Sequence, residues 1–196
     1  MMLGCGLASA SPATADEFVR SSQANVRTGM LSANFSGASS AATGSFSVFT
    51  TMDLEYERFT GPKSSYLVRT LFAFDQTSAR VMYSYAGFGR RFYFGSSRGP
   101  AYEVGEGTEL VSYSPGLRMF AGFDVGVSRV VIDVRGSVFE SASALMDFGG
   151  HGGLAYPITR NVSFTGQLGY SYGYGFSSVA VGATIMKALF GVSIYL

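Results

Sequence analysis

Apolar and polar residues alternate along most of the chain, with the period of two that is typical of a β-strand whose faces meet different surroundings. The pattern is clearest at 162–172, where Val162, Phe164, Leu168, Tyr170 and Tyr172 alternate with serine, threonine, glutamine and glycine. The same alternation predicts strands at about 46–56, 66–74, 79–94, 117–125, 130–138, 146–156, 162–172 and 179–196. The sequence therefore predicts an all-β chain of eight strands.

Three positions interrupt the alternation. The apolar parity changes around Gly87-Phe88-Gly89 and again near Lys187, where we expect β-bulges, and across Ser128-Arg129, where we expect a tight turn. We expect both chain ends and the breaks at 75–78, 128–129 and 157–161 on one side of a barrel, with those at 60–63, 96–116, 140–144 and 173–178 on the other. If 25–35 and part of the long break also pair, ten strands result.

Composition narrows the class of protein. Only 14% of residues are charged and 15% are aromatic, yet no run of 18 apolar residues predicts a membrane helix. Strands this poor in charge would make a poor water-exposed surface. We therefore predict a transmembrane antiparallel up-and-down β-barrel rather than a soluble barrel or sandwich.

The rest of the composition excludes several kinds of partner. A net charge of +1 does not indicate the excess of positive charge that nucleic-acid-binding proteins usually carry. One cysteine and one histidine cannot build an internal disulfide or a Cys/His metal cluster. We expect no cofactor and no metal site.

The last strand places Phe190, Val192, Ile194 and Leu196 on one face up to the end of the chain. It resembles the final strand of outer-membrane β-barrel proteins, in which such alternation is the signal recognised by the assembly machinery. With its strand pattern, segment 45–196 is similar to the OmpA transmembrane domain, OmpX and OmpW families. Leu196 stands where those families usually have Phe, and tryptophan is absent. The resemblance implies a monomer in the bacterial outer membrane, in contact with lipids, lipopolysaccharide and, during insertion, the assembly machinery.

The first 44 residues differ in composition from the rest. Residues 1–15 predict a short export signal, with the cleavage motif Ala13-Thr14-Ala15 before Asp16-Glu17. A flexible tail, or a start further upstream, is the alternative. Residues 16–44 are rich in serine, alanine and glycine, so we expect a flexible tail or a segment inside the barrel, and we place the barrel at 45–196.

Isolated charges of both signs lie on the polar faces of the predicted strands. We expect them inside the barrel as a polar network, formed by Asp53, Glu55, Arg69, Arg118, Asp124, Asp133, Arg135, Asp147 and His151. Buried charges must pair or stay hydrated, and the interior of an eight-stranded barrel is just wide enough for side chains to fill. We therefore expect a structural or surface-interaction role with a filled lumen. The alternative is a narrow channel for small or hydrophobic solutes.

An enzyme is a third possibility, because some small barrels that resemble this one modify lipid A with a serine activated by histidine. The one histidine, His151, falls on the predicted inner face beside Asp147, and Gly153 occupies the next inner position instead of serine. We therefore expect no enzyme.

Basic residues also gather near the predicted outer strand ends. They are Arg58, Lys63, Arg90, Arg91 and Arg98. They could bind lipopolysaccharide phosphates, or they could be solvated loop charges.

Overall fold

The computed structural model describes residues 22–36, 44–61, 64–76, 80–94, 101–105, 108–112, 117–133, 140–159, 161–175 and 182–196. These residues form β1 (Ser22–Ser36), β2 (Gly44–Val48), β3 (Thr50–Gly61), β4 (Ser64–Phe74), β5 (Val81–Phe94), β6 (Ala101–Gly105), β7 (Thr108–Ser112), β8 (Arg118–Asp133), β9 (Glu140–Pro157), β10 (Val162–Gly175) and β11 (Gly182–Tyr195). Within these ranges no helix is long and apolar enough to cross a membrane.

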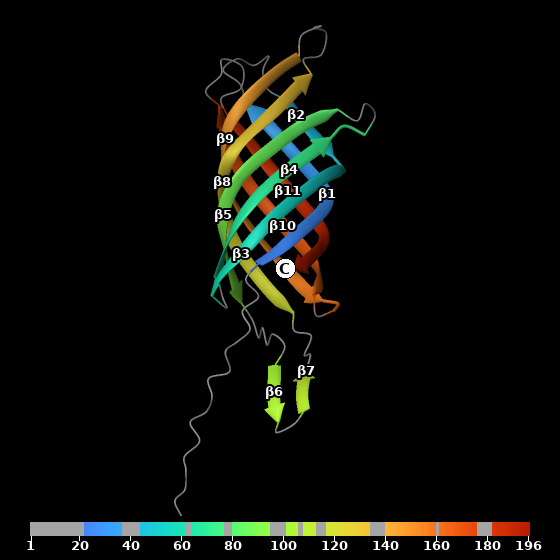
Figure 1. The fold of residues 1–196 in the computed structure, drawn as a ribbon. Coiled ribbons are helices and arrows are strands. Elements are labelled where there is room, and N and C mark those ends of the chain that lie inside the picture. Colours follow the sequence, from blue (N-terminus) through green and yellow to red (C-terminus); the bar gives the residue numbers. More distant parts are fainter. Residues whose placement is uncertain are drawn as a thin grey trace, which may run out of the picture.

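The main sheet closes on itself. Its order is β11-β10-β9-β8-β5-β4-β3-β1-β2, every neighbouring pair is antiparallel, and β1 pairs with β11 from Gln23–Tyr195 to Ser36–Gly182 (Figure 1). Because β2 and β3 both pair with β1, they are two halves of one strand. The result is a closed up-and-down barrel of eight strands, as predicted. Closure gives each of the eight strands two neighbours along most of the wall, although the segment β2 pairs only with β1.

The break between β2 and β3 is a β-bulge. Residues 28–30 of β1 lie opposite 49–52, so one strand has an extra residue at this point. The bulge reverses the side-chain parity: Val48 is buried inside the barrel, whereas Met52 and Tyr56 are exposed on the outer wall. The strand predicted at about 46–56 has unbroken alternation, which places all three of these residues on one apolar face, and this prediction was wrong for Val48.

Two errors in the predicted strands compensate for each other. Residues 22–36, expected in a tail or a lumen segment, form the barrel strand β1, so the barrel begins at Ser22 rather than at residue 45. The turn expected at Ser128-Arg129 does not exist, because β8 runs unbroken through it. The ten-strand alternative is also wrong, since β6 and β7 pair only with each other. The predicted export signal lies outside the described residues.

The two ends of the barrel hold different connections. The start of β1 and the end of β11 share one end, here called the termini end, with the connections β3–β4, β5–β8 and β9–β10. The other end, the distal end, holds the connections β1–β2, β4–β5, β8–β9 and β10–β11. Figure 1 shows β6 and β7 beyond the termini end. The breaks at 60–63, 75–78 and 96–116 therefore lie at the ends opposite to those predicted.

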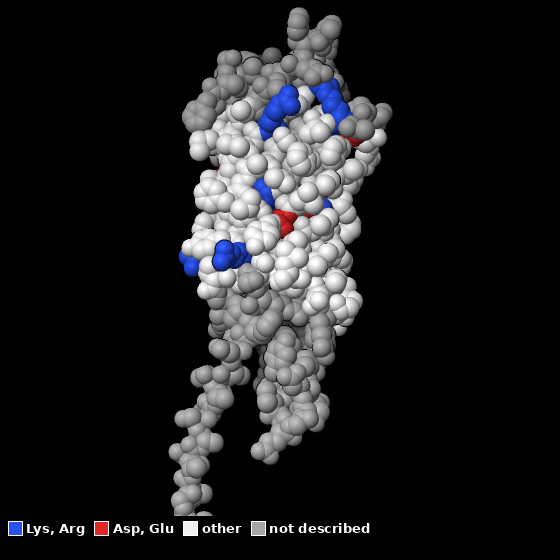
Figure 2. All heavy atoms as spheres, viewed as in Figure 1, with Lys and Arg blue, Asp and Glu red and all other residues white. Residues whose placement is uncertain are grey.

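The outer wall is apolar. Large hydrophobic side chains are exposed on every barrel strand, among them Val26, Val68, Phe88, Phe148 and Leu168. Among strand residues with described side chains, the charged ones that point outward are Arg58, Arg90 and Arg129. The face in Figure 2 is accordingly mostly uncharged, and much of its positive charge lies toward the two ends.

The inside of the barrel has two regions. Toward the distal end lies a buried apolar cluster, built by Leu31, Ala33, Phe35, Val48, Leu71, Ala73, Tyr83, Tyr85, Val130, Leu145, Ala183, Ile185 and Leu189. Toward the termini end the inward side chains are polar or charged. The predicted bulges at 87–89 and near Lys187 are wrong, because the pairings of β5 with β8 and of β10 with β11 run without a shift.

Candidate functional site

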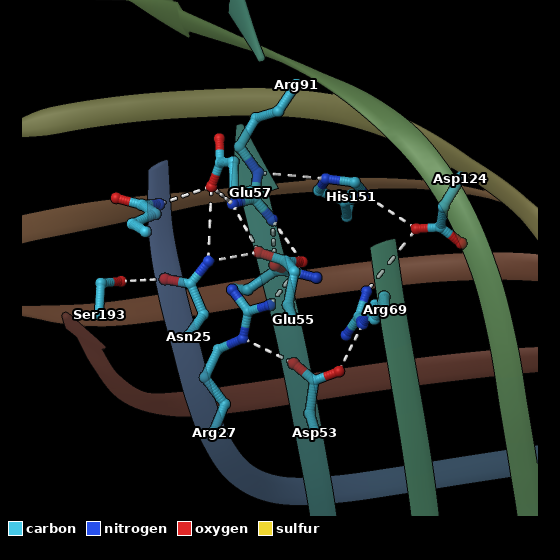
Figure 3. A network of polar contacts seen from close by, with 12 residues as sticks. Asn25, Arg27, Asp53, Glu55, Glu57, Arg69, Arg91, Asp124, His151 and Ser193 are labelled. Atoms are coloured by element: carbon cyan, nitrogen blue, oxygen red, sulfur yellow. Dashed lines mark hydrogen bonds and ion pairs between the residues drawn. The ribbon is translucent and has the colours of Figure 1, made fainter. Parts of the chain in front are cut away.

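The largest polar cluster of the described residues crosses the lumen, and Arg91 of β5 lies at its centre (Figure 3). Arg91 Nη1 lies 2.8 Å from Glu55 Oε1 and 2.6 Å from Glu57 Oε2. Arg91 Nη2 donates a hydrogen bond of 3.2 Å to Gln167 Oε1 on β10. One guanidinium thus ties β3 and β5 to β10. Such multiple charge-assisted bonds are stronger than bonds between neutral groups.

A second set of ion pairs continues from Glu55 around the wall. Arg27 Nε on β1 lies 2.7 Å from Asp53 Oδ2, and Arg27 Nη2 lies 2.7 Å from Glu55 Oε2. Arg69 Nε on β4 donates to the other oxygen of Asp53, and Arg69 Nη1 lies 3.6 Å from Asp124 Oδ2 on β8. The cations and carboxylates therefore alternate from β1 through β3 and β4 and, past β5, to β8.

His151 on β9 extends this set through Asp124. His151 Nδ1 lies 2.9 Å from Asp124 Oδ2, and the hydroxyl of Tyr85 donates to Asp124 Oδ1 at 2.9 Å. Gly122 makes room for the imidazole, because a Cβ at that position would lie 2.7 Å from His151 Nε2. The His151 side chain is 1% exposed and points into the lumen.

Neutral donors satisfy the remaining carboxylate oxygens. Glu57 accepts hydrogen bonds from Gln23 Nε2 and from the hydroxyls of Ser65 and Tyr93. Asp147 lies nearer the distal end and accepts a 2.8 Å bond from the hydroxyl of Tyr83. Buried carboxylates need such partners, because an unpaired one would lose its hydration without compensation.

The buried charges nearly balance. Described buried residues include the bases Arg27, Arg69, Arg91 and Lys187 and the acids Asp53, Glu55, Glu57, Asp124 and Asp147. Arg118 adds a half-buried positive charge at the termini end, with Nη1 3.3 Å from the hydroxyl oxygen of Tyr195. No group of three or more His, Cys, Asp or Glu side chains in the described ranges could hold a metal ion. The paired charges can therefore cross-link the wall from inside.

The structure places most of the predicted network residues in the lumen. These are Asp53, Glu55, Arg69, Arg118, Asp124, Asp147 and His151. The side chain of Asp133 and the whole of Arg135 lie outside the described part of the chain.

Sequence analysis missed four buried charges. Arg27 was assigned to the tail, Arg91 to the surface and Lys187 to a bulge, while Glu57 was left out of the predicted network. Strand parity could have found two of them, because Glu57 shares its parity with Asp53 and Glu55, and Arg91 shares its parity with Tyr93.

The predicted lipopolysaccharide contacts need correction. Arg91 is 1% exposed and cannot reach a lipid. Arg58 and Arg90 do point outward, but they lie toward the termini end rather than the distal end. Lys63 and Arg98 lie outside the described residues.

The predicted assembly signal lies on the outer wall. Its four residues are exposed on one face of β11 and of the residue that follows it, next to the seam with β1. They are Phe190, Val192, Ile194 and Leu196. Their alternation is as predicted, and their recognition by the assembly machinery stays a prediction.

Comparisons with solved structures support the fold. The chain is similar to neisserial surface protein A, with a TM-score of 0.55 and 15% identity over 89% of this chain and 97% of that one. It is also similar to the N-terminal β-barrel domain of Pseudomonas aeruginosa OprF, with a TM-score of 0.53 and 11% identity over the same shares of the two chains. No protein-family model and no curated protein sequence matches the chain. The chain has the closed eight-stranded antiparallel fold of small outer-membrane β-barrels.

Proposed function

We propose that this protein is an integral barrel of the bacterial outer membrane with a structural or surface-interaction role and a lumen filled by side chains. The observation that supports this most directly is the contrast between the two faces of the wall. Exposed apolar side chains cover the outside, whereas the charged barrel-strand residues whose side chains are described, apart from Arg58, Arg90 and Arg129, point inward. A water-soluble barrel would need the opposite arrangement.

A filled lumen favours the structural role over a channel. Arg91 bonds to three strands besides its own, β3, β9 and β10, and Glu55 and Glu57 beside it are at most 3% exposed. Opening a water path would break several charge-assisted bonds at once. The apolar cluster toward the distal end is a second barrier, because ions cannot cross it without losing their hydration. In this proposal the termini end faces the periplasm, and the distal connections face outside and make any surface contacts.

The position of His151 argues against lipid A chemistry. Its imidazole points into the lumen, where its close partners are Asp124 and Arg91 Nε, at 3.5 Å. The inward imidazole is therefore turned away from a lipid at the outer wall. We propose that the protein is not an enzyme, and expect no deacylation of lipid A by the purified barrel in an assay by mass spectrometry.

Two measurements test the proposal. The protein should fold in detergent and migrate differently on a denaturing gel with and without boiling, as closed membrane barrels do. Inserted into planar bilayers, it should give no steady conductance. A variant that lacks the centre of the polar network, Glu55→Ala with Arg91→Ala, serves as the control and should conduct more than the unmodified protein. A steady conductance of the unmodified protein, as large as that of this variant, would overturn the filled lumen and support the channel.

A further inference from the structure

Three outward side chains form a row across β3, β4 and β5 near the termini end. Arg58 is the direct register partner of Tyr66, and Tyr66 is the partner of Arg90. Because neighbouring strands lie about 5 Å apart, the backbones of Arg58 and Arg90 are about 10 Å apart, with Tyr66 between them. Two arginine side chains at this spacing can reach one group lying over the tyrosine.

The guanidinium of Arg90 is held in place by aromatic rings. Its Cζ lies 5.3 Å from the centroid of the Tyr66 ring and 5.2 Å from that of Phe92. Phe92 is two residues closer to the termini end, so the guanidinium leans toward that end of the wall. A stacked guanidinium has lost part of its rotamer freedom, and its edge can still donate hydrogen bonds to a ligand.

These charges lie on a surface that offers them no anionic partner among the described residues. Arg58 and Arg90 form no ion pair with any residue in the described ranges, and the exposed neighbours around them, Tyr56, Tyr66 and Phe92, are aromatic. Tyr66 is the third residue of β4, which puts the row about 5 Å from the strand end, measured along the barrel axis, for a strand tilted by about 45° to that axis. At that depth, lipid phosphates meet the wall of a membrane barrel.

We propose that Arg58, Tyr66 and Arg90 bind the phosphate of an anionic phospholipid in the leaflet at the termini end. The two guanidiniums donate to the phosphate oxygens, and the Tyr66 hydroxyl supplies a further donor at the edge of the site. This inference rests on the proposed outer-membrane placement with the termini end toward the periplasm. The leaflet there contains phospholipid, whereas lipopolysaccharide occupies the opposite leaflet.

The test compares lipids of opposite headgroup charge. The full chain is reconstituted with equal amounts of phosphatidylglycerol and phosphatidylcholine of identical acyl chains, and bound lipid is counted by native mass spectrometry. We expect the unmodified protein to retain phosphatidylglycerol preferentially. Replacing both arginines, Arg58→Gln with Arg90→Gln, should reduce that preference about tenfold, because each cation near the membrane surface contributes to anionic lipid binding.

Two control variants show whether a loss of lipid preference is specific to Arg58 and Arg90. Arg129→Gln removes the outward arginine at the distal side of the wall and should leave the preference unchanged, and Arg58→Lys with Arg90→Lys should restore part of it. An equal loss in Arg129→Gln, an undiminished preference in the double glutamine variant, or displacement of the lipid by inorganic phosphate would overturn the site. Loss of lipopolysaccharide binding rather than phosphatidylglycerol binding would place the row in the other leaflet and overturn it too.

The outcome is separable from the proposed function. Each variant is checked for the heat-dependent gel shift, so an unfolded variant is not counted as a loss of binding. A protein that inserts into bilayers and shows no headgroup preference refutes the lipid site alone. A protein that fails to insert refutes the membrane placement and the site with it.

Discussion

Replacement of Arg91 by methionine should strongly destabilise the barrel, although the two side chains have similar length. Arg91 contributes ion pairs of 2.8 Å to Glu55 and 2.6 Å to Glu57, and its Cζ lies 4.3 Å from the ring centroid of Phe120. Without it, Glu55 keeps the 2.7 Å ion pair with Arg27. Glu57 keeps hydrogen bonds from neutral donors but loses the cation with which it is paired.

The expected magnitude follows from the burial of the carboxylate that is left behind. Glu57 is 0% exposed, so its charge cannot regain water when Arg91 is removed. Breaking a buried ion pair in this way costs about 3–5 kcal/mol. Removing both charges with Arg91→Met and Glu57→Gln should recover most of that loss, because replacement of a whole buried pair by neutral groups is often close to neutral.

The assay is equilibrium unfolding by urea in a neutral detergent, followed by β-sheet circular dichroism and by the fraction that migrates as the folded form without boiling. Arg90→Met is the matched control, since Arg90 is the adjacent residue but points outward; we expect it to change the free energy of unfolding by less than about 0.5 kcal/mol. Equal effects of Arg91→Met and Arg90→Met would show that the lumen carboxylates are hydrated, and the argument for a filled lumen would fail.

Two further predictions concern closure and orientation. Gly29→Ala should reduce the yield of the folded form, because a Cβ there would lie 2.0 Å from the carbonyl oxygen of Ala188 across the β1–β11 seam; Gly166→Ala, where nothing lies within 4 Å, should fold normally on the same gel. With the native cysteine removed, a cysteine replacing Gln76 at the distal end should react with a membrane-impermeant maleimide on intact cells. A cysteine replacing Thr159 at the termini end should react only after the outer membrane is permeabilised, and the reverse pattern would contradict the proposed orientation.

The fold class was predictable because alternation survives in any strand that separates two environments. The outer face is uniformly apolar in β10, where Phe164, Leu168 and Tyr170 are all exposed, and this strand was predicted within a few residues of its bounds. The inward charges Asp53, Asp124 and Asp147 were also predictable, since a carboxylate on a strand of a membrane barrel is costly on the lipid-facing side and therefore faces the lumen. Which charges meet was not predictable, because that depends on the register between strands.

The missed strand β1, the false turn in β8 and the two false bulges share one physical cause, which is the apolar half of the lumen. Along β11 the apolar alternation follows the outer face near Phe190 and the buried inner face near Ile185. The parity of the apolar pattern therefore changes along the strand, although its register with β10 has no shift.

The same change occurs at Val130 of β8 and between Tyr85 and Phe88 of β5, and it was interpreted as a turn in β8 and a bulge in β5. In β1 the apolar residues point outward at Val26 and inward at Leu31. This change of parity within one strand is why residues 22–36 were predicted to be a tail or lumen segment.

A barrel whose lumen is polar throughout would show none of these shifts. Aligned parity changes in consecutive strands are therefore evidence of an apolar layer inside a barrel. Here they locate the boundary at which the charged network ends and the apolar cluster toward the distal end begins.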